Sequence, residues 1–187
     1  MVSQVSQKYR SRNAQLFPRL GWLLSGLAAS FTVAWAAGVR VNLTESIPLG
    51  VYRESGDASE LERGDVVLVC LPQSTAQLAH SRGYVPGGGR CVGGLAPVGK
   101  LVMALPGDTV SVAPTGLSVN GSPVRHSSAL DHDSEGRPLP RTPAGRWIVQ
   151  SRTLWLVGTS SRSFDSRYFG PVPQDDVLSR IRLIHRI

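Results

Sequence analysis

The feature of this sequence that most constrains its fold is an uncharged stretch at residues 20–39, LGWLLSGLAASFTVAWAAGV. Its 20 residues are about the length that an α-helix needs to cross the apolar core of a bilayer. The stretch continues past Ala34-Trp35-Ala36, which resembles the cleavage site of a secretory signal. We therefore expect a retained transmembrane anchor at residues 20–39, with a cleaved signal as the alternative.

The basic residues are concentrated around this stretch. Residues 1–40 contribute +5 of the formal net charge of +7 and contain no Asp or Glu, whereas the other 147 residues hold 15 basic and 13 acidic side chains. Four positive charges precede the stretch and Arg40 follows it, so residues 1–19 are expected to be a cytoplasmic basic tail. This distribution fits a single-pass membrane protein, in contact with lipid, and disfavours a nucleic-acid partner. The body of the chain would lie outside, on the far side of the membrane.

Residues 41–187 consist of short apolar runs separated by turn residues, which is typical of a mostly β domain. Asn120-Gly121 is a strong signal for a tight hairpin turn. Surface insertions are expected at about 73–99, with a short helix near 74–82, and at about 126–145. The expected strands are residues 66–71, 101–105, 109–112, 117–119, 146–149, 153–157 and a last strand within 176–187.

No pattern for a metal or cofactor is complete in this chain. The four His residues share no ligand spacing, and neither HExxH nor CxxC occurs. Residues 94–100 have the Gly and Lys spacing of a phosphate-binding loop, but Leu101 stands where Ser or Thr would hold magnesium. We therefore expect neither a metal nor a cofactor.

The two cysteines, Cys70 and Cys91, would lie in an oxidising space once the body is exported. We expect one disulfide between them, which would tie the strand at 66–71 to the first insertion. Two buried, unpaired thiols are the alternative.

Lys100 is a candidate general base. It opens an apolar strand and is the only lysine after Lys8, while the other basic residues of the body are Arg, which cannot give up a proton. Burial between apolar strands would lower the lysine pKa and free its lone pair for a serine nucleophile. The alternative is an ordinary lysine whose amine reaches solvent.

Three segments, in order, resemble the type I signal peptidase family. They are TESIPLGVYR at 44–53, GKLVMALPGDTVSV at 99–112 with VNG at 119–121, and SFDSRYFGPVP at 163–173. The resemblance implies a mostly β fold, a signal peptidase-like β-barrel or coiled β-sheet body on a single N-terminal transmembrane helix. It also implies a serine peptidase in which Ser46 is the nucleophile and Lys100 the general base.

The first segment is more similar to a subfamily, the TraF-type peptidases of conjugative transfer systems. SIPLGVY at 46–52 resembles their nucleophile box, and the insertion with Tyr84-Val85-Pro86 and Cys91 is similar as well. The resemblance implies maturation of a conjugative pilin precursor beside the transfer machinery, by hydrolysis or by joining the pilin ends through an acyl-enzyme. Two alternatives stay open: a general type I signal peptidase acting on exported preproteins, and a non-catalytic assembly domain of a secretion or mating apparatus.

The resemblance also assigns supporting residues. The Thr44 hydroxyl and the Ser46 backbone N–H would hold the oxyanion. Ser163 would orient the lysine, and Asp165 and Arg167 would brace the site. For the last two residues, an ordinary surface ion pair is the alternative.

The sequence departs from the general signal peptidase pattern at two places. Leu101 follows the lysine where Arg is usual, and residues 158–160 are Gly-Thr-Ser in place of Gly-Asp-Asn. These departures loosen the tie to housekeeping signal peptidases and leave Ser46 and Lys100 in place. The expected substrate is an extended segment with small residues beside the cut.

Overall fold

The computed structural model describes residues 22, 24–30, 32–56 and 58–187. The chain divides into two compact units, Met1–Val39 and Arg40–Ile187. In the first unit, residues 22, 24–30 and 32–36 are helical. Among the described residues, no helix is both long enough and apolar enough to span a bilayer. The predicted tail, residues 1–19, and residues 20, 21, 23 and 31 of the predicted anchor lie outside the described part of the chain.

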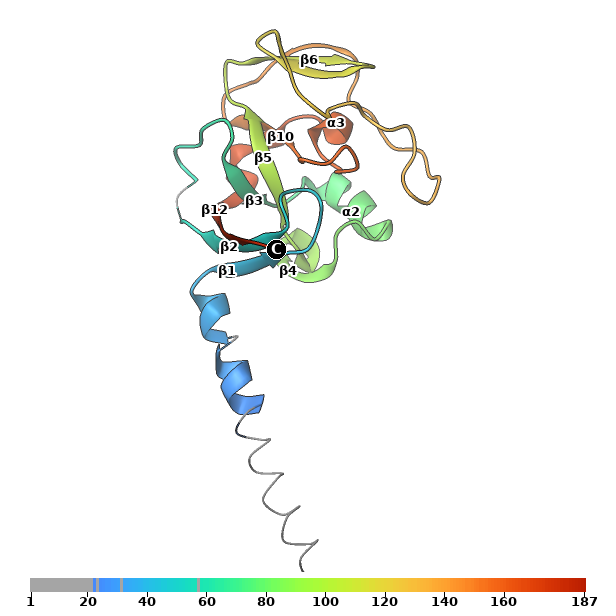
Figure 1. The fold of residues 1–187 in the computed structure, drawn as a ribbon. Helices are drawn as coiled ribbons and strands as arrows, with labels where there is room; N and C mark the ends of the chain where they lie inside the picture. The colour runs from blue at the N-terminus through green and yellow to red at the C-terminus, as the bar shows by residue number, and fades with distance from the viewer. Residues whose placement is uncertain (1–21, 23, 31, 57) are drawn as a thin grey trace, which may run out of the picture. The chain divides into compact units, whose positions relative to one another are not determined.

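The body contains a seven-stranded sheet with the strand order β1-β2-β12-β3-β5-β10-β11 (Figure 1). The pairs from β2 to β11 along this order are antiparallel. The order has two ends, so the described strands form an open sheet and not the closed barrel that was one expected form. The strands are β1 Val39–Asn42, β2 Gly50–Glu54, β3 Val66–Val69, β5 Val98–Ala104, β10 Thr153–Val157, β11 Val172–Pro173 and β12 Val177–Arg186.

A smaller sheet has the order β8-β7-β6-β9, and all its pairs are antiparallel. Its strands are β6 Thr109–Ala113, β7 Gly116–Val119, β8 Ser122–Pro123 and β9 Gly145–Ile148. The turn between β7 and β8 contains Asn120 and Gly121, whose φ angles are 51° and 83°. Both are positive, as a tight hairpin turn requires, so the hairpin predicted from Asn-Gly is confirmed.

Strand β5 places Lys100 among apolar side chains. Side chains alternate between the two faces of a strand, and Lys100, Val102 and Ala104 are all buried on one face. On β3, Val67 pairs directly with Lys100 and is fully buried. Lys100 thus shares a strand face with Val102 and pairs with Val67, and both valines belong to one hydrophobic core.

The first insertion contains the helix predicted near residues 74–82, which is α2, Gln73–Ser81, so this prediction is confirmed. It also contains two elements that the sequence does not predict, strand β4, Gly87–Cys91, and the short helix η1, Val92–Gly94. In β4, Gly89 packs against the backbone of residues 95 and 96. A Cβ at Gly89 would lie 2.2 Å from the Leu95 carbonyl oxygen, so this close approach requires glycine at position 89.

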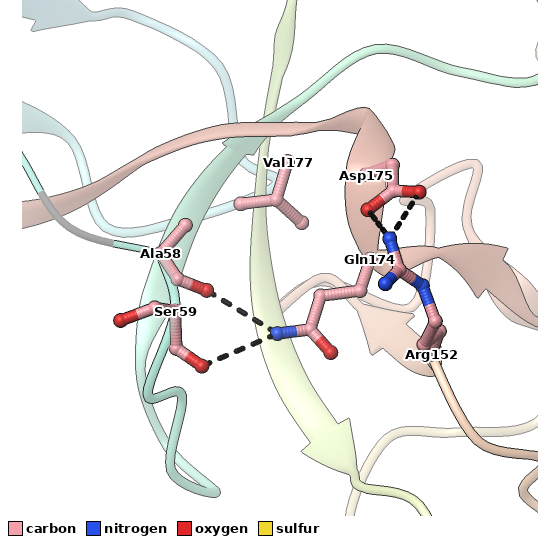
Figure 2. A pocket seen from close by; sticks show the side chains of 6 residues that line it. All are labelled: Ala58, Ser59, Arg152, Gln174, Asp175 and Val177. Carbon is pink, nitrogen blue, oxygen red and sulfur yellow. Dashed lines mark hydrogen bonds and ion pairs between the residues drawn. The ribbon is translucent and has the colours of Figure 1, made fainter.

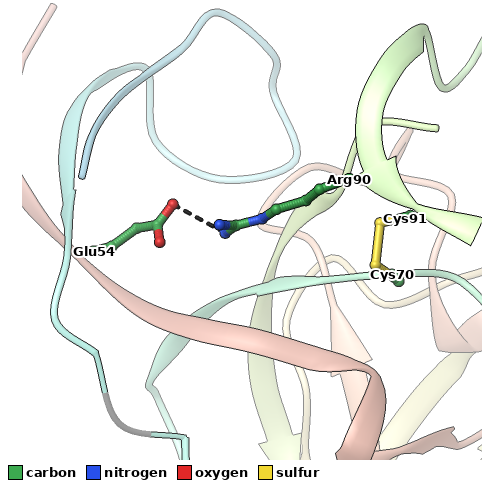
Figure 3. Close-up of a disulfide and its surroundings, with 4 residues drawn as sticks. All are labelled: Glu54, Cys70, Arg90 and Cys91. Carbon is green, nitrogen blue, oxygen red and sulfur yellow. Dashed lines mark hydrogen bonds and ion pairs between the residues drawn. A yellow bond between two sulfur atoms is a disulfide. The ribbon is translucent and has the colours of Figure 1, made fainter. Parts of the chain in front are cut away.

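Two contacts fasten this insertion to the large sheet (Figure 3). A disulfide joins Cys70, just after β3, to Cys91 at the end of β4, with 5.5 Å between their Cα atoms. Arg90 Nη2 lies 3.0 Å from Glu54 Oε1 on β2. The insertion is thus held from β3 by a covalent bond and from β2 by an ion pair.

The second insertion docks on the first through Asp133. The Asp133 carboxylate accepts hydrogen bonds from the Tyr84 hydroxyl and from Arg137 Nε, the latter at 2.6 Å. The Tyr84 ring lies 5.3 Å from the ring of Phe164. Phe164 precedes helix α3, Ser166–Phe169, and the Leu130 N–H of the second insertion donates to the Tyr168 hydroxyl of this helix at 3.0 Å. Both insertions therefore contact the segment that follows Ser163.

Candidate active site

The candidate site is centred on the Lys100 side-chain nitrogen. The residue is 2% exposed, and its Nζ lies 3.2 Å from Ser46 Oγ and 2.8 Å from Ser163 Oγ. The two serine oxygens are 3.4 Å apart. The fold therefore brings together three residues proposed from the sequence, from β5, from the loop between β1 and β2, and from the loop after β10.

Burial lowers the pKa of Lys100 from 10.5 to about 8. The loss of hydration is the largest cause, Asp165 opposes it by favouring the charged form, and Arg167 adds to it. With a pKa of about 8, roughly one lysine in ten is a free amine at pH 7. Lys100 can therefore accept a proton under neutral conditions, which an exposed lysine rarely does.

Ser46 lies in the loop between β1 and β2 and is half-buried. Thr159 donates its backbone N–H to the Ser46 carbonyl at 2.8 Å. The Ser46 backbone N–H has no acceptor among the described residues. A free N–H on the attacking residue is a suitable donor to a developing oxyanion.

Thr44, which the resemblance assigns to the oxyanion, is exposed and bonded elsewhere. Its hydroxyl donates to Asn42 Oδ1 at 2.7 Å, and its N–H donates to the same oxygen at 3.2 Å. Because a hydroxyl has one proton, Thr44 must leave Asn42 before it can donate to an oxyanion. Asn42 was not predicted from the sequence; an Asn two residues before a Thr is the signal of an Asx turn and could have indicated it.

Gly158 allows the chain after β10 to approach both serines. A Cβ at this position would lie 2.1 Å from Ser163 Oγ and 2.9 Å from the Ser46 carbonyl oxygen. Only glycine lacks that atom, so the close approach depends on residue type. Residues 158–160 were noted as a departure from the family pattern, and the structure places Gly158 and Thr159 against Ser46.

Asp165 and Arg167 form a buried ion pair behind Ser163. Their side chains are 0% and 1% exposed, and Arg167 Nε lies 2.7 Å from Asp165 Oδ1. Arg167 Nη2 donates to Asp165 Oδ2 at 2.8 Å and to the Ser163 carbonyl at 2.8 Å. The other guanidinium hydrogen bonds go to the backbone carbonyls of residues 126, 128, 160 and 161. The pair is therefore part of the interior and not an ordinary surface pair.

The arrangement of these groups is suited to acyl transfer by a serine. A hydroxyl lies beside an amine with a lowered pKa, and a backbone N–H is free beside it. Within the described part of the chain, no group of three or more His, Cys, Asp or Glu side chains could hold a metal ion.

A family described as signal peptidase, peptidase S26, matches residues 19–186. The chain belongs to the peptidase S26 family of signal peptidases. This membership makes it a serine peptidase of the signal peptidase type and confirms the resemblance expected from the three segments.

This S26 peptidase is similar to transfer proteins named TraF. It is 40% identical over 166 residues to plasmid transfer protein TraF of Escherichia coli, which covers 87% of this chain and 92% of the relative. It is 36% identical over 170 residues to a probable conjugal transfer protein TraF of Sinorhizobium fredii, over 90% of this chain and 88% of the relative. The crystal structure of a signal peptidase I from Enterococcus faecalis aligns with a TM-score of 0.37 at 19% identity, over 65% of this chain and 97% of that chain.

Proposed function

We propose that this S26 peptidase is a membrane-bound serine endopeptidase with a Ser46–Lys100 dyad, and that it matures a conjugative pilin. The observation that supports the dyad most is the surroundings of the Lys100 nitrogen, which is buried and bonded to two hydroxyls. The similarity to TraF transfer proteins supports the choice of a pilin as substrate.

In the proposed first step, Ser46 Oγ attacks the carbonyl carbon of the scissile peptide bond. The neutral Lys100 amine takes the Ser46 proton as the new C–O bond forms. The resulting ammonium then gives that proton to the leaving amine as the C–N bond breaks. The products are an ester of Ser46, a free amine and a neutral Lys100. The proton taken from Ser46 thus ends on the leaving amine.

The negative charge that forms on the carbonyl oxygen needs a hydrogen-bond donor. The Ser46 N–H is free to supply one bond, and the Thr44 hydroxyl can supply another once it leaves Asn42. Ser163 keeps the lysine directed at Ser46, and the Asp165–Arg167 pair holds the Ser163 carbonyl in place.

The acyl-enzyme allows two outcomes. Water attacking the ester gives a cleaved pilin, whereas the amino end of the same pilin gives a cyclic product. We place the anchor in a bacterial inner membrane with its N-terminus in the cytoplasm, and the catalytic body in the periplasm. The partners would be the pilin precursor, membrane lipid and the conjugative transfer machinery.

The test is coexpression of the full chain with the pilin gene of its transfer system, followed by mass spectrometry of the pilin. A cut pilin and a cyclic pilin differ in mass by one water molecule. Ser46→Ala and Lys100→Arg are the controls, and both should leave the precursor intact. Processing that persists in both variants would contradict the dyad.

Cleavage of exported preproteins is the second candidate, because the matching family is described as signal peptidases. It predicts that a reporter with an ordinary secretory signal is cut as fast as the pilin. A non-catalytic assembly domain, the third possibility, predicts normal pilus assembly in the Lys100→Arg variant.

A further inference from the structure

The side chain of Asn42, at the end of β1, makes five hydrogen bonds to the loop that carries Ser46. Its Nδ2 donates to the carbonyls of Thr44, Ile47 and Pro48 at 2.8, 3.0 and 3.1 Å, so one of its two hydrogens is shared between two carbonyls. Its Oδ1 accepts from the N–H and the hydroxyl of Thr44. We infer that Asn42 is a positioning residue for the nucleophile, an inference that rests on the proposed role of Ser46.

The partners fix the orientation of the Asn42 amide. Three carbonyls face Nδ2, which can only donate, and two donors of Thr44 face Oδ1, which can only accept. A carboxylate here would set an oxygen against the carbonyls of Ile47 and Pro48. An apolar side chain would leave all five groups without this partner. The position therefore requires an amide.

The backbone carbonyls of residues 44–49 show how the Asn42 amide holds the loop that carries Ser46. All six from Thr44 to Leu49 accept a hydrogen bond from the scaffold, and three of them are bonded by Asn42. The other donors are the Thr159 hydroxyl and N–H and the Ile187 N–H, while the Tyr52 hydroxyl shares the Pro48 carbonyl. The Ser46 N–H has no acceptor in the described chain. The loop is thus fastened by its carbonyls, and the N–H of the nucleophile itself is not used to hold the loop to the described part of the chain.

The loop position sets the 3.2 Å distance between Ser46 Oγ and Lys100 Nζ. Misplacement of reacting groups on the order of 1 Å lowers a rate by roughly 100-fold. Removing Asn42 leaves Ser46 and Lys100 chemically intact but releases the loop between them. The effect should therefore fall on kcat, with a change in KM of less than about threefold.

The test compares Asn42→Ala and Asn42→Asp with Asn120→Ala in the full chain. Asn120 is a matched control, because its amide also bonds backbone and side chain: Oδ1 accepts from Thr109 N–H and Nδ2 donates to Asp108. The probe is cleavage of a pilin-derived peptide, measured as kcat and KM, together with the thermal midpoint and deuterium exchange of residues 43–52.

We expect kcat to fall about 10- to 100-fold in both Asn42 variants and exchange of residues 43–52 to rise. Asn120→Ala should lower the thermal midpoint and keep kcat. A kcat for Asn42→Asp equal to that of the wild type would overturn the inference, since this near-isosteric variant retains the volume and loses the amide. Cleavage that survives in Ser46→Ala would instead overturn the proposed function itself, and the exchange data would still report whether Asn42 holds the loop.

Discussion

Lys100 and Arg167 are both buried cations of one site, each 2% exposed, yet their surroundings differ. Arg167 is bonded to a carboxylate and to five backbone carbonyls. The Lys100 nitrogen is bonded to two hydroxyls. Burial of the guanidinium is therefore compensated by an anion in direct contact, whereas burial of the lysine is not, and the lysine pKa falls to about 8. The contrast shows that this fold lowers the pKa of one buried cation by keeping carboxylates out of contact with it, while it supplies a carboxylate to the neighbouring cation.

The largest effect is expected when the residue at position 100 can no longer lose its proton, because this removes the difference between the two buried cations. Lys100→Arg cannot deprotonate, and Ser46→Ala removes the nucleophile, so each should lower kcat/KM by at least about 1,000-fold. Cleavage of a pilin-derived peptide measures the effect. Lys8→Arg, at the only other lysine of the chain, is the matched control and should keep full activity. Wild-type activity in Lys100→Arg would contradict the proposal that Lys100 is the general base.

The second prediction concerns Arg167, when the carboxylate of Asp165 is removed. Asp165→Asn leaves a buried guanidinium without its carboxylate and should lower the free energy of unfolding by about 3–5 kcal/mol. Arg152 and Asp175 supply the control (Figure 2). Their side chains are 74% and 71% exposed, so Asp175→Asn should cost less than about 1 kcal/mol. Urea unfolding of both variants gives the comparison, and equal losses would show that burial does not matter here.

The third prediction uses the lowered pKa of Lys100. Because the free amine is the active form, kcat/KM should fall about tenfold for each pH unit below about 8 and level off above it. Stability should rise with pH between about 8 and 10.5, where the unfolded chain still binds a proton that the folded chain has released. Below pH 8 the lysine is protonated in both the folded and the unfolded chain. The cost of burying its charge, which lowers the free energy of unfolding, is then constant at about 3 kcal/mol.

Lys100→Met tests both parts of this prediction. It should be inactive, unfold at a higher urea concentration at pH 7, and lose the change in stability between pH 8 and 10.5. If kcat/KM of the wild type did not change between pH 6 and 9, the titration of Lys100 would not control the rate.

The smallest expected effect comes from the residue that orients the lysine. Ser163→Ala removes the 2.8 Å hydrogen bond to Lys100 and should lower kcat/KM by about tenfold, because the dyad stays intact. Ser179 is the control, since it is 2% exposed and its hydroxyl has no partner among the described residues. Ser179→Ala should therefore change neither rate nor stability by a measurable amount. Equal rates for the two variants would leave Ser163 without a role.

The order of the strands and the burial of Lys100 could be predicted from the sequence. Alternation along β5 put Lys100 on the buried face, and the strands around it follow the expected order. The glycine run of β4 was missed, because a run of Gly has no periodic pattern and its purpose is a close backbone approach at Gly89. Local sequence patterns do not report such an approach between distant segments.

The supporting groups of the site were less predictable for the same reason. The resemblance suggested Asp165 and Arg167, but the five carbonyls around Arg167 come from loops that no local pattern brings together. The Asx-turn spacing of Asn42 and Thr44 is a local signal, but the hydrogen bonds of Asn42 to the Ile47 and Pro48 carbonyls have none, because backbone groups carry no residue identity. The bond between the Thr44 hydroxyl and Asn42 depends on the conformation of this loop.

The hydrogen bonds of Arg167 also bear on how the second insertion communicates with the site. The guanidinium donates to the carbonyls of residues 126 and 128, where that insertion begins, and to the carbonyls of residues 160, 161 and 163. One buried side chain therefore joins the second insertion to the loop that carries Ser163. A break in the insertion would reach the Ser163 carbonyl through this single arginine.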